Sequence, residues 1–372
     1  MRDETLALFW KYLRGSRLAA RGSRLALECA IALACLSFSR LAASTQYVAP
    51  SSNSSKHTII DRLSWDHVEG FCLADSIGKE IYAGSRNRLY HTTDSGKTWT
   101  KLGELPNITL IKEIIPISRA RIFVNTSKGF DGTAFLSVDS GHTFCQCVPS
   151  TGEGACAWFL RDKGVLYVAS QKPFCIMESK DSGISWTIAS HLIDTLKKPD
   201  ICSMLVKDTK FYISTSLPPA IYYSSDLDEP WKKIFTDPLF TDSRMPSNRE
   251  VPLVTKWGNR LVACVASGPH GSRQQLYISD NDGNSWRGID CPFIIWGIGV
   301  NNVDTSTMWI GNYGNSPWPE PHTALRYSRD NGRTWNMVPN CGASIFWRLE
   351  ELPDHSLYAA TDFGLIRVKL NE

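Results

Sequence analysis

Six copies of an eight-residue motif recur along this 372-residue sequence and divide most of it into segments of similar length. Five copies closely resemble one another: TTDSGKTW (92–99), SVDSGHTF (137–144), SKDSGISW (179–186), SDNDGNSW (279–286) and SRDNGRTW (328–335). A degenerate copy, SSDLDEPW, fills the gap at 224–231. The final aromatic residues of successive copies are 45, 42, 45, 55 and 49 residues apart. A period of about 40–50 residues indicates propeller blades or another array of stacked units.

Each of these octets, numbered 1 to 6 in chain order, has the composition of a tight turn that leads into a strand. The third residue is Asp, or Asn281 in octet 5, and its side chain can accept hydrogen bonds from backbone N–H groups across the turn. The fifth residue is usually Gly, which adopts the positive φ that a chain reversal needs. The last residue is an aromatic that can pack against a neighbouring unit. Octet 4 has Asp228 in place of Gly and Pro230 in place of Thr or Ser, so a looser turn is predicted there.

The octet resembles the Asp-box, or BNR repeat, of sialidase-like propellers, and the resemblance covers residues 58–372. It implies an all-β propeller in which the octet joins the third and fourth strands of each blade. In that family the octet is a structural turn, so its aspartates are not predicted to be catalytic.

The number of blades follows from the segments outside the octets. Three strand-like segments without an octet, SIFWRLEEL, SLYAATD and GLIRVKL, follow octet 6, and a spare strand, TIIDRLSW, lies at 58–65. Pairing the two ends of the chain gives a seventh blade and a closed ring, which removes exposed sheet edges. We therefore predict a seven-bladed β-propeller closed by N- and C-terminal strands. Sialidases have six blades, so this count is more similar to xyloglucanase-like hydrolases and photosystem II assembly-factor propellers.

The charge distribution separates a leader from the body of the chain. Residues 1–44 contain 7 Lys and Arg against 3 Asp and Glu, whereas the remaining residues contain 33 against 34. A nearly neutral body argues against a nucleic-acid partner, which would need a basic face. The leader combines basic residues, a short apolar run and small residues, and so resembles a signal peptide. A transit peptide, a start codon further downstream and an amphipathic helix of the body remain alternatives.

These features predict three parts: a leader at 1–44, a polar linker at 45–57 and the propeller at 58–372. A signal peptide would make the protein secreted, periplasmic or lumenal. The body has no apolar run of membrane-spanning length, so no membrane span is predicted there. The cysteines and histidines form no ligand set at metal-binding spacing, and no cofactor motif occurs, so neither a metal nor a cofactor is predicted.

Three long insertions mark the candidate functional region. They occupy 235–250, 267–274 and 312–323, and the propeller topology puts them on the face opposite the octet turns. Long loops on a rigid scaffold often carry function. The candidate ligand-binding residues are the cations, acids and aromatics of these loops together with one tryptophan on an inner strand: Arg244, Arg249, Glu250, His270, Arg273, Tyr313, Trp318, Glu320, His322 and Trp347. Trp296, on another inner strand, is expected to line the central channel close by.

Two classes of function fit these residues. The first is a binding or assembly module for a glycan or protein partner, since flat aromatics beside polar groups suit sugars and arginines suit carboxylates. The alternative is a glycoside hydrolase of sialidase-like or xyloglucanase-like type, in which Glu250 and Glu320 would be the carboxylate pair. Arg121-Ile122-Phe123 lacks the proline of the sialidase arginine motif, so no sialidase catalytic residue carries over. Whether the protein is an enzyme stays open at this point.

Overall fold

The computed structural model is all-β: in the ranges that it describes, every regular element is a strand. All of these ranges belong to one compact unit, Ser52–Glu372. They are 58–64, 67–106, 108, 110–128, 131–147, 156–171, 174–192, 201–215, 219–236, 250–267, 273–291, 295, 297–301, 305, 307–311, 325–338, 341, 343 and 345–370. The leader and the linker lie outside the described residues.

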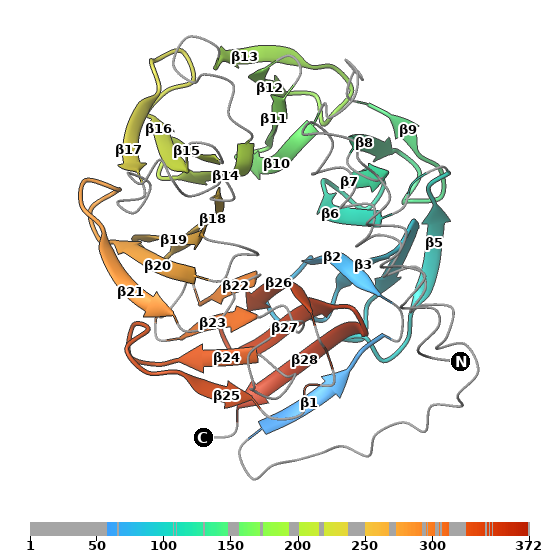
Figure 1. Ribbon diagram of the computed structural model, residues 1–372. Coiled ribbons are helices and arrows are strands. Elements are labelled where there is room, and N and C mark those ends of the chain that lie inside the picture. The colour runs from blue at the N-terminus through green and yellow to red at the C-terminus, as the bar shows by residue number, and fades with distance from the viewer. Residues whose placement is uncertain are drawn as a thin grey trace, which may run out of the picture. The chain divides into compact units, whose positions relative to one another are not determined.

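The strands form seven sheets of four strands each, and each sheet is one blade of a ring (Figure 1). Blade 1 consists of β2 (Val68–Leu73), β3 (Ile81–Ser85), β4 (Arg88–Thr92) and β5 (Thr100–Glu104); blade 2 of β6 (Leu110–Pro116), β7 (Ile122–Lys128), β8 (Asp131–Ser137) and β9 (Cys145–Gln146); blade 3 of β10 (Cys156–Asp162), β11 (Val165–Gln171), β12 (Phe174–Ser179) and β13 (Thr187–His191); blade 4 of β14 (Ile201–Lys207), β15 (Lys210–Thr215), β16 (Ala220–Ser224) and β17 (Lys232–Thr236). Blade 5 consists of β18 (Glu250–Trp257), β19 (Arg260–Ser267), β20 (Arg273–Ser279) and β21 (Arg287–Cys291); blade 6 of β22 (Gly297–Val300), β23 (Met308–Gly311), β24 (Leu325–Ser328) and β25 (Asn336–Val338); blade 7 of β26 (Phe346–Glu351), β27 (Ser356–Thr361), β28 (Gly364–Leu370) and β1 (Thr58–Arg62).

Blade 7 closes the ring with strands from both ends of the chain, which confirms the predicted closure. Strand β1 pairs antiparallel with β28, from Thr58 opposite Leu370 to Arg62 opposite Ile366. Figure 1 shows β1 beside β28 at the outer edge of this blade. The seven-bladed β-propeller predicted from the repeat is therefore the observed fold.

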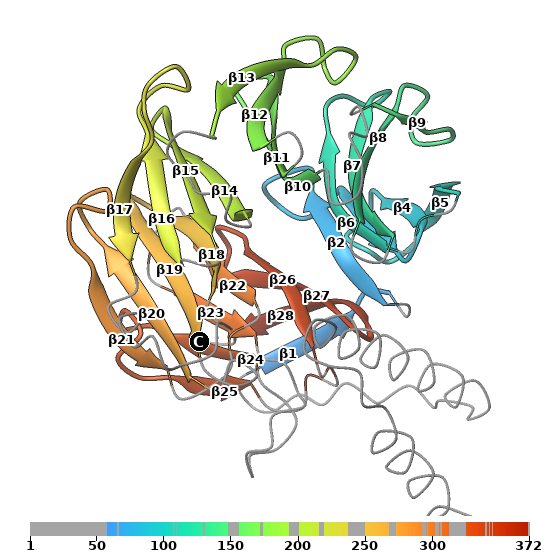
Figure 2. The same ribbon diagram turned by 45° about the horizontal axis from the view of Figure 1, so that its top comes forward.

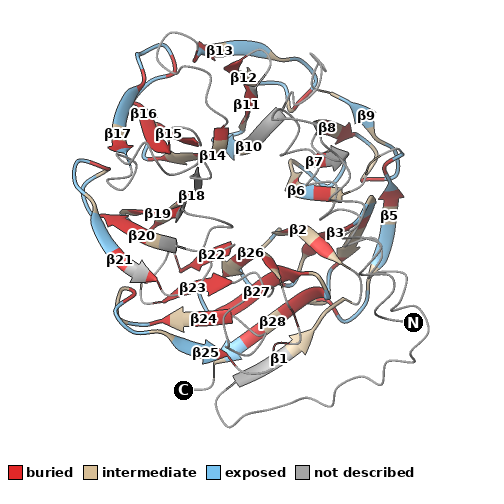
Figure 3. Ribbon diagram, viewed as in Figure 1, coloured by how far each residue is buried: buried red, intermediate tan, exposed pale blue. Residues whose placement is uncertain are grey.

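Burial decreases from the middle of each blade to its outer strand (Figure 3). All five residues of β3 and all six of β27 are buried, whereas the outer strands β5, β13 and β17 share one mostly exposed pattern. The hydrophobic clusters lie between blades. One of them, for example, joins Ile176 of blade 3 to Met204 and Ile213 of blade 4. Blade-to-blade packing of apolar side chains therefore holds the ring together.

The octets form turns between the third and fourth strands, and their polar side chains hold these turns internally. In octet 1, Asp94 accepts hydrogen bonds from the backbone N–H of Thr98 (2.9 Å) and from its hydroxyl (2.6 Å). The Thr92 hydroxyl donates to Asp94 (2.7 Å) and accepts from the N–H of Gly96 (3.2 Å). Ser95 and Gly96 have φ values of 61° and 84°, which explains the glycine. The corresponding bonds recur in octets 2, 3, 5 and 6.

Octet 4 lacks this arrangement, as its sequence predicted. Pro230 has no N–H to donate to Asp226, and no residue of this octet has a positive φ. The Ser224 hydroxyl instead donates to the backbone carbonyls of Asp226 and Glu229, the latter at 3.1 Å. Leu227 is buried at the position that is polar in every other octet. Octet 4 is therefore a different turn that occupies the same place in its blade.

The strand order defines two faces of the ring. Each blade is an antiparallel meander, so the first-to-second and third-to-fourth connections lie on one face, which we call the octet face. The second-to-third connections, and those that lead from one blade to the next, lie on the other face. Since the three long insertions are all of these latter kinds, we call it the insertion face. Figure 2 shows blades 4 and 5 from the side, with their strands running between the two faces.

Candidate ligand-binding site

The backbone brings two of the sequence-predicted candidates to the same end of blade 5. Glu250 is the first residue of β18 and pairs with Ala266, and Arg273 is the first residue of β20 and pairs with Ser267. Both residues therefore flank the end of β19 on the insertion face. Insertions 235–250 and 267–274 thus emanate from one end of one sheet.

The other loop candidates cannot be placed. Eight candidates lie outside the described residues: Arg244, Arg249, His270, Trp296, Tyr313, Trp318, Glu320 and His322. The insertion 312–323 joins β23 to β24, which is a second-to-third connection and hence on the insertion face. The Glu250–Glu320 pair therefore stays a prediction from the sequence.

Trp347 lies on the inner strand β26, as predicted, but in blade 7 rather than beside Glu250 in blade 5. Its ring centroid is 5.8 Å from that of His67, the residue that precedes β2 in blade 1. The indole also packs against the hydrophobic cluster that contains Val68 and Phe71. Trp347 thus marks the junction of blades 7 and 1 on the insertion face.

Six of the seven inner strands have a β-bulge near their start, after the first residue in five of them and after the second residue in β6. One extra residue on the inner strand has no direct partner on the second strand. The extra residues include Glu69 in β2, Lys112 in β6, Cys202 in β14 and Trp347 in β26. Bulges are frequent next to binding and active sites because they redirect a side chain. Here they recur at one level of the ring, close to the insertion face.

Blades 7, 1 and 2, which are neighbours in the ring, contribute polar and aromatic side chains at the level of the bulges and further along the inner strands, away from the insertion face. We call the set the inner sector. It consists of His67, which directly precedes β2, Glu69 of β2, Lys112 of β6, and Trp347, Arg348 and Glu350 of β26. Within it, His67 Nε2 lies 3.2 Å from Glu69 Oε1. The Glu69 side chain is 12% exposed and that of His67 27% exposed. Lys112 is exposed.

Alternation along β26 turns Arg348 and Glu350 toward blade 1. The Arg348 guanidinium lies 5.7 Å from the centre of the Phe71 ring, and one of its nitrogens is 3.9 Å from Glu350 Oε2. The side chains of Arg348 and Glu350 are 40% and 37% exposed. Protein nevertheless surrounds Glu350 closely enough that burial raises its carboxyl pKa, while the Arg348 charge acts in the opposite direction. Glu350 is therefore a recessed carboxyl group that solvent still reaches.

The alternate residues of β26 face blade 6 and have a structural role. Glu351 Oε2 accepts a hydrogen bond from Trp309 Nε1 at 2.8 Å, and its Oε1 lies 3.1 Å from His355 Nδ1. The Glu351 side chain is fully buried, which raises the pKa of its carboxyl, and the hydrogen bonds from His355, Trp309 and Asn301 oppose that rise. This network joins blades 6 and 7 near the octet face.

Glycines let the bulged backbone approach the preceding blade. A Cβ atom on Gly70 of blade 1 would lie 2.5 Å from the carbonyl oxygen of Lys112, the bulge residue of blade 2. A Cβ atom on Gly297 of blade 6 would lie 3.1 Å from the Phe346 carbonyl oxygen, next to the bulge of blade 7. These close contacts fix the position of the bulges relative to the neighbouring inner strands.

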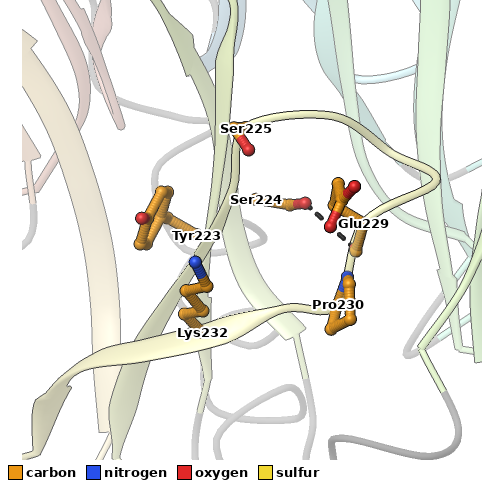
Figure 4. Close-up of a pocket in the computed structure, with 6 residues that line it drawn as sticks. All are labelled: Tyr223, Ser224, Ser225, Glu229, Pro230 and Lys232. Carbon is orange, nitrogen blue, oxygen red and sulfur yellow. Dashed lines mark hydrogen bonds between the residues drawn. The ribbon is translucent and has the colours of Figure 1, made fainter.

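A small hollow lies on blade 4, beside octet 4 (Figure 4). Its volume is about 10 Å³, which is room for about one water molecule. The lining residues are Tyr223, Ser224, Ser225, Glu229, Pro230 and Lys232. The hollow is a consequence of the altered turn and is far too small for a sugar or a peptide side chain.

The described ranges contain no group of three or more His, Cys, Asp or Glu side chains arranged to hold a metal ion. Nor does any helix in these ranges have the length and apolar character that crossing a bilayer requires.

Comparison with known proteins supports the fold and leaves the family open. No family model matches the chain, and no curated protein matches it. Solved propeller structures do match the chain. A GH74 enzyme from Niastella koreensis superposes with a TM-score of 0.58 at 15% identity over 82% of this chain and 53% of its own. YCF48 bound to D1 peptide gives a TM-score of 0.59 at 13% identity over 86% and 99%, and the WD40 propeller domain of Doa1 gives 0.54 at 13% over 84% and 97%.

At these identities the comparisons show a shared fold alone. The chain spans about half the length of the GH74 enzyme and nearly the whole length of YCF48. The structural neighbours therefore include a GH74 enzyme and a propeller solved with a bound peptide.

Most of the inner sector was not among the sequence-predicted candidates. Only Trp347 was, because its aromatic side chain stood out on an inner strand. Glu69, Lys112 and Glu350 lie in short strands with ordinary alternation, and nothing in the sequence signals a bulge at Glu69 or Lys112. The repetition of bulges at one position became visible only from strand register.

Proposed function

We propose that the protein is a binding propeller that takes a protein or peptide segment at the inner sector on its insertion face. The observation that carries the proposal is the recurrence of a bulge near the start of six inner strands, which places Glu69, Lys112 and Trp347 of three neighbouring blades at one level close to the insertion face. Partly exposed Arg348 and Glu350 extend this surface inward.

The combination of side chains suits a polypeptide partner. Aromatic and arginine side chains such as Trp347 and Arg348 are enriched where proteins bind one another, and carboxylates and ammonium groups add directional contacts. A propeller of matching length, YCF48, was solved with a peptide bound. The octets are internally satisfied turns and offer no comparable set of groups.

Site-specific photo-crosslinking tests this function in cells. A photoreactive amino acid at position 347 or 112 is expected to capture one discrete protein. The matched control is the same amino acid at position 337, because Met337 is an exposed residue on the outer strand β25. The proposal would be contradicted if the photoreactive amino acid captured a protein only at position 337. It would also be contradicted if no protein were captured at positions 347 and 112.

Glycoside hydrolysis is the second candidate, favoured by a specific pair of side chains. Glu69 and Glu350 lie on neighbouring inner strands, and the raised pKa of Glu350 is the property that a general acid requires. Turnover of chromogenic glycosides by the wild-type chain, lost in Glu350→Gln and in Glu69→Gln, would favour this function. Absence of turnover on all substrates of a broad panel would count against it.

We further propose that residues 1–44 export the protein to a secreted, periplasmic or lumenal location. The basic, acid-poor composition of this segment supports the proposal. Mass spectrometry of the protein isolated from its source should then find a mature N-terminus between residues 44 and 58. An intact Met1, or fractionation with the cytosol, would contradict it.

A further inference from the structure

We infer that the octet face of blades 1, 2 and 3 binds an anionic lipid surface, with three apolar side chains entering the headgroup region. These side chains, which we call the apolar tips, are Ile77, Val138 and Ile184. The inference goes beyond the proposed function, because it concerns the opposite face of the ring and leaves the insertion face free for a polypeptide.

The apolar tips are the most exposed large hydrophobic side chains of the described ranges. Ile77 is 70% exposed, and Val138 and Ile184 are each 60% exposed. Ile77 lies in the connection between β2 and β3, Val138 in octet 2 and Ile184 in octet 3, so the three project from one face of successive blades. Val138 is the second residue of its octet and Ile184 the sixth, and both positions are polar in every other octet. These blades therefore depart from the repeat in the same direction.

Printed contacts hold the connections that carry the tips together. The N–H of Ser95 in octet 1 donates to the carbonyl of Lys79 at 3.0 Å, close to Ile77. A Cβ atom on Gly103 of blade 1 would lie 2.2 Å from the carbonyl oxygen of Gly141 in octet 2. Arg161 of blade 3 donates to the carbonyl of Pro116 in blade 2 at 3.1 Å. The tips therefore stand on a connected, rigid surface.

Charge in this sector is nearly balanced by number, and exposure decides its outward sign. The octet-face connections of blades 1 to 3 hold six Lys and Arg against five Asp and Glu, and Arg161 and Asp162 at the end of β10 add one of each sign. Five of the six cations are exposed: Lys79, Lys97, Arg119, Lys163 and Lys180. Lys180 also pairs with Glu178 at 2.6 Å. Of the five carboxylates one is exposed, Asp181.

These carboxylates accept hydrogen bonds from donors within the same loops. Asp75 accepts from the N–H groups of Ile77 at 3.0 Å and Lys79 at 2.9 Å. Glu80 Oε1 lies 3.0 Å from His91 Nε2. Asp94, Asp139 and Asp181 accept the bonds that close their octets. Cations and apolar tips are therefore the groups that this sector presents outward.

Blades 4 and 5 show the opposite distribution on the same face. Their octet-face connections, all of which the structure describes, hold six carboxylates and neither Lys nor Arg. Five of the six are exposed: Asp208, Asp226, Asp228, Glu229 and Asp280. Lys207, Lys210 and Arg260 at strand ends pair with three carboxylates of this group, whereas three exposed acids lie together in octet 4. An anionic surface is therefore attracted to blades 1 to 3 and repelled by octet 4.

A lipid surface fits both the apolar tips and the exposed cations. Binding at a bilayer interface combines buried apolar side chains with the attraction of Lys and Arg to anionic headgroups, and single tips can enter a fluid interface separately. A second copy of the chain could set these cations against the carboxylates of blades 4 and 5. It would then also press the apolar tips against carboxylates and remove water from them, which is unfavourable.

Sedimentation of the full chain with vesicles tests the inference. The chain should bind vesicles of phosphatidylcholine with phosphatidylserine, bind phosphatidylcholine alone more weakly, and release as salt is raised. The double substitution Val138→Ser and Ile184→Ser should weaken binding at least about tenfold. Phe363→Ser is the matched control, since Phe363 is an exposed apolar residue between β27 and β28 on the insertion face.

The positive charge has its own pair of variants. Arg119→Ser with Lys163→Ser should weaken binding to the vesicles that contain phosphatidylserine and leave binding to phosphatidylcholine alone unchanged. Arg88→Ser is the control, because Arg88 is an exposed cation that begins β4 at the insertion face. Thermal unfolding of each variant checks that the fold is retained.

Each contrary outcome has a definite meaning. If the wild-type chain does not sediment with phosphatidylserine vesicles, or if the Val138 and Ile184 double variant binds them as well as wild type does, the inference is overturned. Retention on immobilised polyglutamate without vesicle binding would also overturn it and would indicate an acidic protein partner. Crosslinking at positions 347 and 112 probes the other face, so failure of either experiment leaves the other conclusion standing.

Discussion

The indole Nε1 of Trp99 donates a hydrogen bond to the backbone carbonyl of Leu63 over 2.6 Å. Trp99 ends octet 1 in blade 1, whereas Leu63 directly follows β1, the outer strand of blade 7. Trp286 of octet 5 makes the equivalent bond to Ile234 of blade 4 at 3.2 Å. In octets 1 and 5 the final tryptophan thus joins its blade to the preceding blade, and at Trp99 this bond lies across the closure of the ring.

Trp99→Phe should lower the free energy of unfolding by about 1–2 kcal/mol, because the carbonyl of Leu63 loses its partner while most of the apolar contact remains. Phe144 ends octet 2, so a phenyl ring is compatible with this position. Urea-induced unfolding, followed by tryptophan fluorescence and by circular dichroism, measures the change. An unchanged midpoint would mean that the bond adds nothing to ring closure.

The octet aspartates should make the protein sensitive to strong acid. Hydrogen bonds from Thr98 and Thr92 lower the pKa of Asp94 to about 2, and those from Thr143 and Ser137 do the same for Asp139. A lowered carboxyl pKa contributes stability above the ordinary value of 3.8, and that contribution is lost as pH falls through about 2.

Asp139→Asn tests this acid sensitivity, because octet 5 shows that Asn forms the same turn. The variant should lose less stability than the wild type between pH 4 and pH 2. The melting temperature measured across this range is the readout. Parallel curves for the two proteins would argue against the octets as the titrating groups.

Glu351 should produce a pH dependence of the opposite sign. Its buried carboxyl has a raised pKa, so its favourable contribution is complete below the ordinary value of 4.5 and is lost as pH rises through the folded-state pKa. Glu351→Gln keeps an acceptor for Trp309 Nε1 and removes the titration. The stability of wild type relative to this variant should therefore fall as pH increases above 4.5, as measured by urea unfolding at several pH values. A difference that is constant with pH would contradict this.

Gly70→Ala should destabilise the protein by about 1–3 kcal/mol, because the added methyl group meets the Lys112 carbonyl at 2.5 Å. The same contact positions the bulge of β6, so peptide binding at the inner sector should weaken as well. Gly288→Ala is a suitable control, since its nearest neighbour at 2.8 Å is the flexible end of the Gln275 side chain. Equal effects of the two substitutions would show that the Gly70 contact is not special.

Restoring octet 4 should stabilise blade 4. The double substitution Asp228→Gly and Pro230→Thr returns the glycine and the N–H donor that the other octets use, so Asp226 could accept the usual hydrogen bonds. We expect a gain of about 1 kcal/mol in the free energy of unfolding. Pro230→Thr alone, without the glycine, should give less, and a loss in the double variant would show that the buried Leu227 determines this turn instead.

The fold was predictable because the octets repeat one physical solution. Asp94, Gly96 and Trp99 each have a role that depends on local geometry, and the same three roles recur at almost constant spacing. The spare strand at 58–65 was identifiable because blade 7 lacked one strand, and a propeller tolerates no open edge. Octet 4 was predicted to differ because Pro230 cannot donate a hydrogen bond.

The candidate site was much less predictable. Loop length predicted a site at 235–250, 267–274 and 312–323, and the structure places the backbone of Glu250 and Arg273 at one end of blade 5. The inner sector depends on register: one extra residue in a strand decides where Glu69 and Lys112 point, and a single sequence carries no signal of that shift. Similarly, burial raises the pKa of the Glu350 carboxyl, and a single sequence does not show which segments come together to bury it.

The pairing of β1 with β28 also constrains how the protein is made. During synthesis β1 is the first strand of the propeller to leave the ribosome, whereas its partner β28 is the last strand of the ring to emerge. Until then blades 1 and 7 cannot join, and an incomplete ring presents adhesive apolar surfaces that invite aggregation. Truncated products that lack β28 should therefore depend on chaperones.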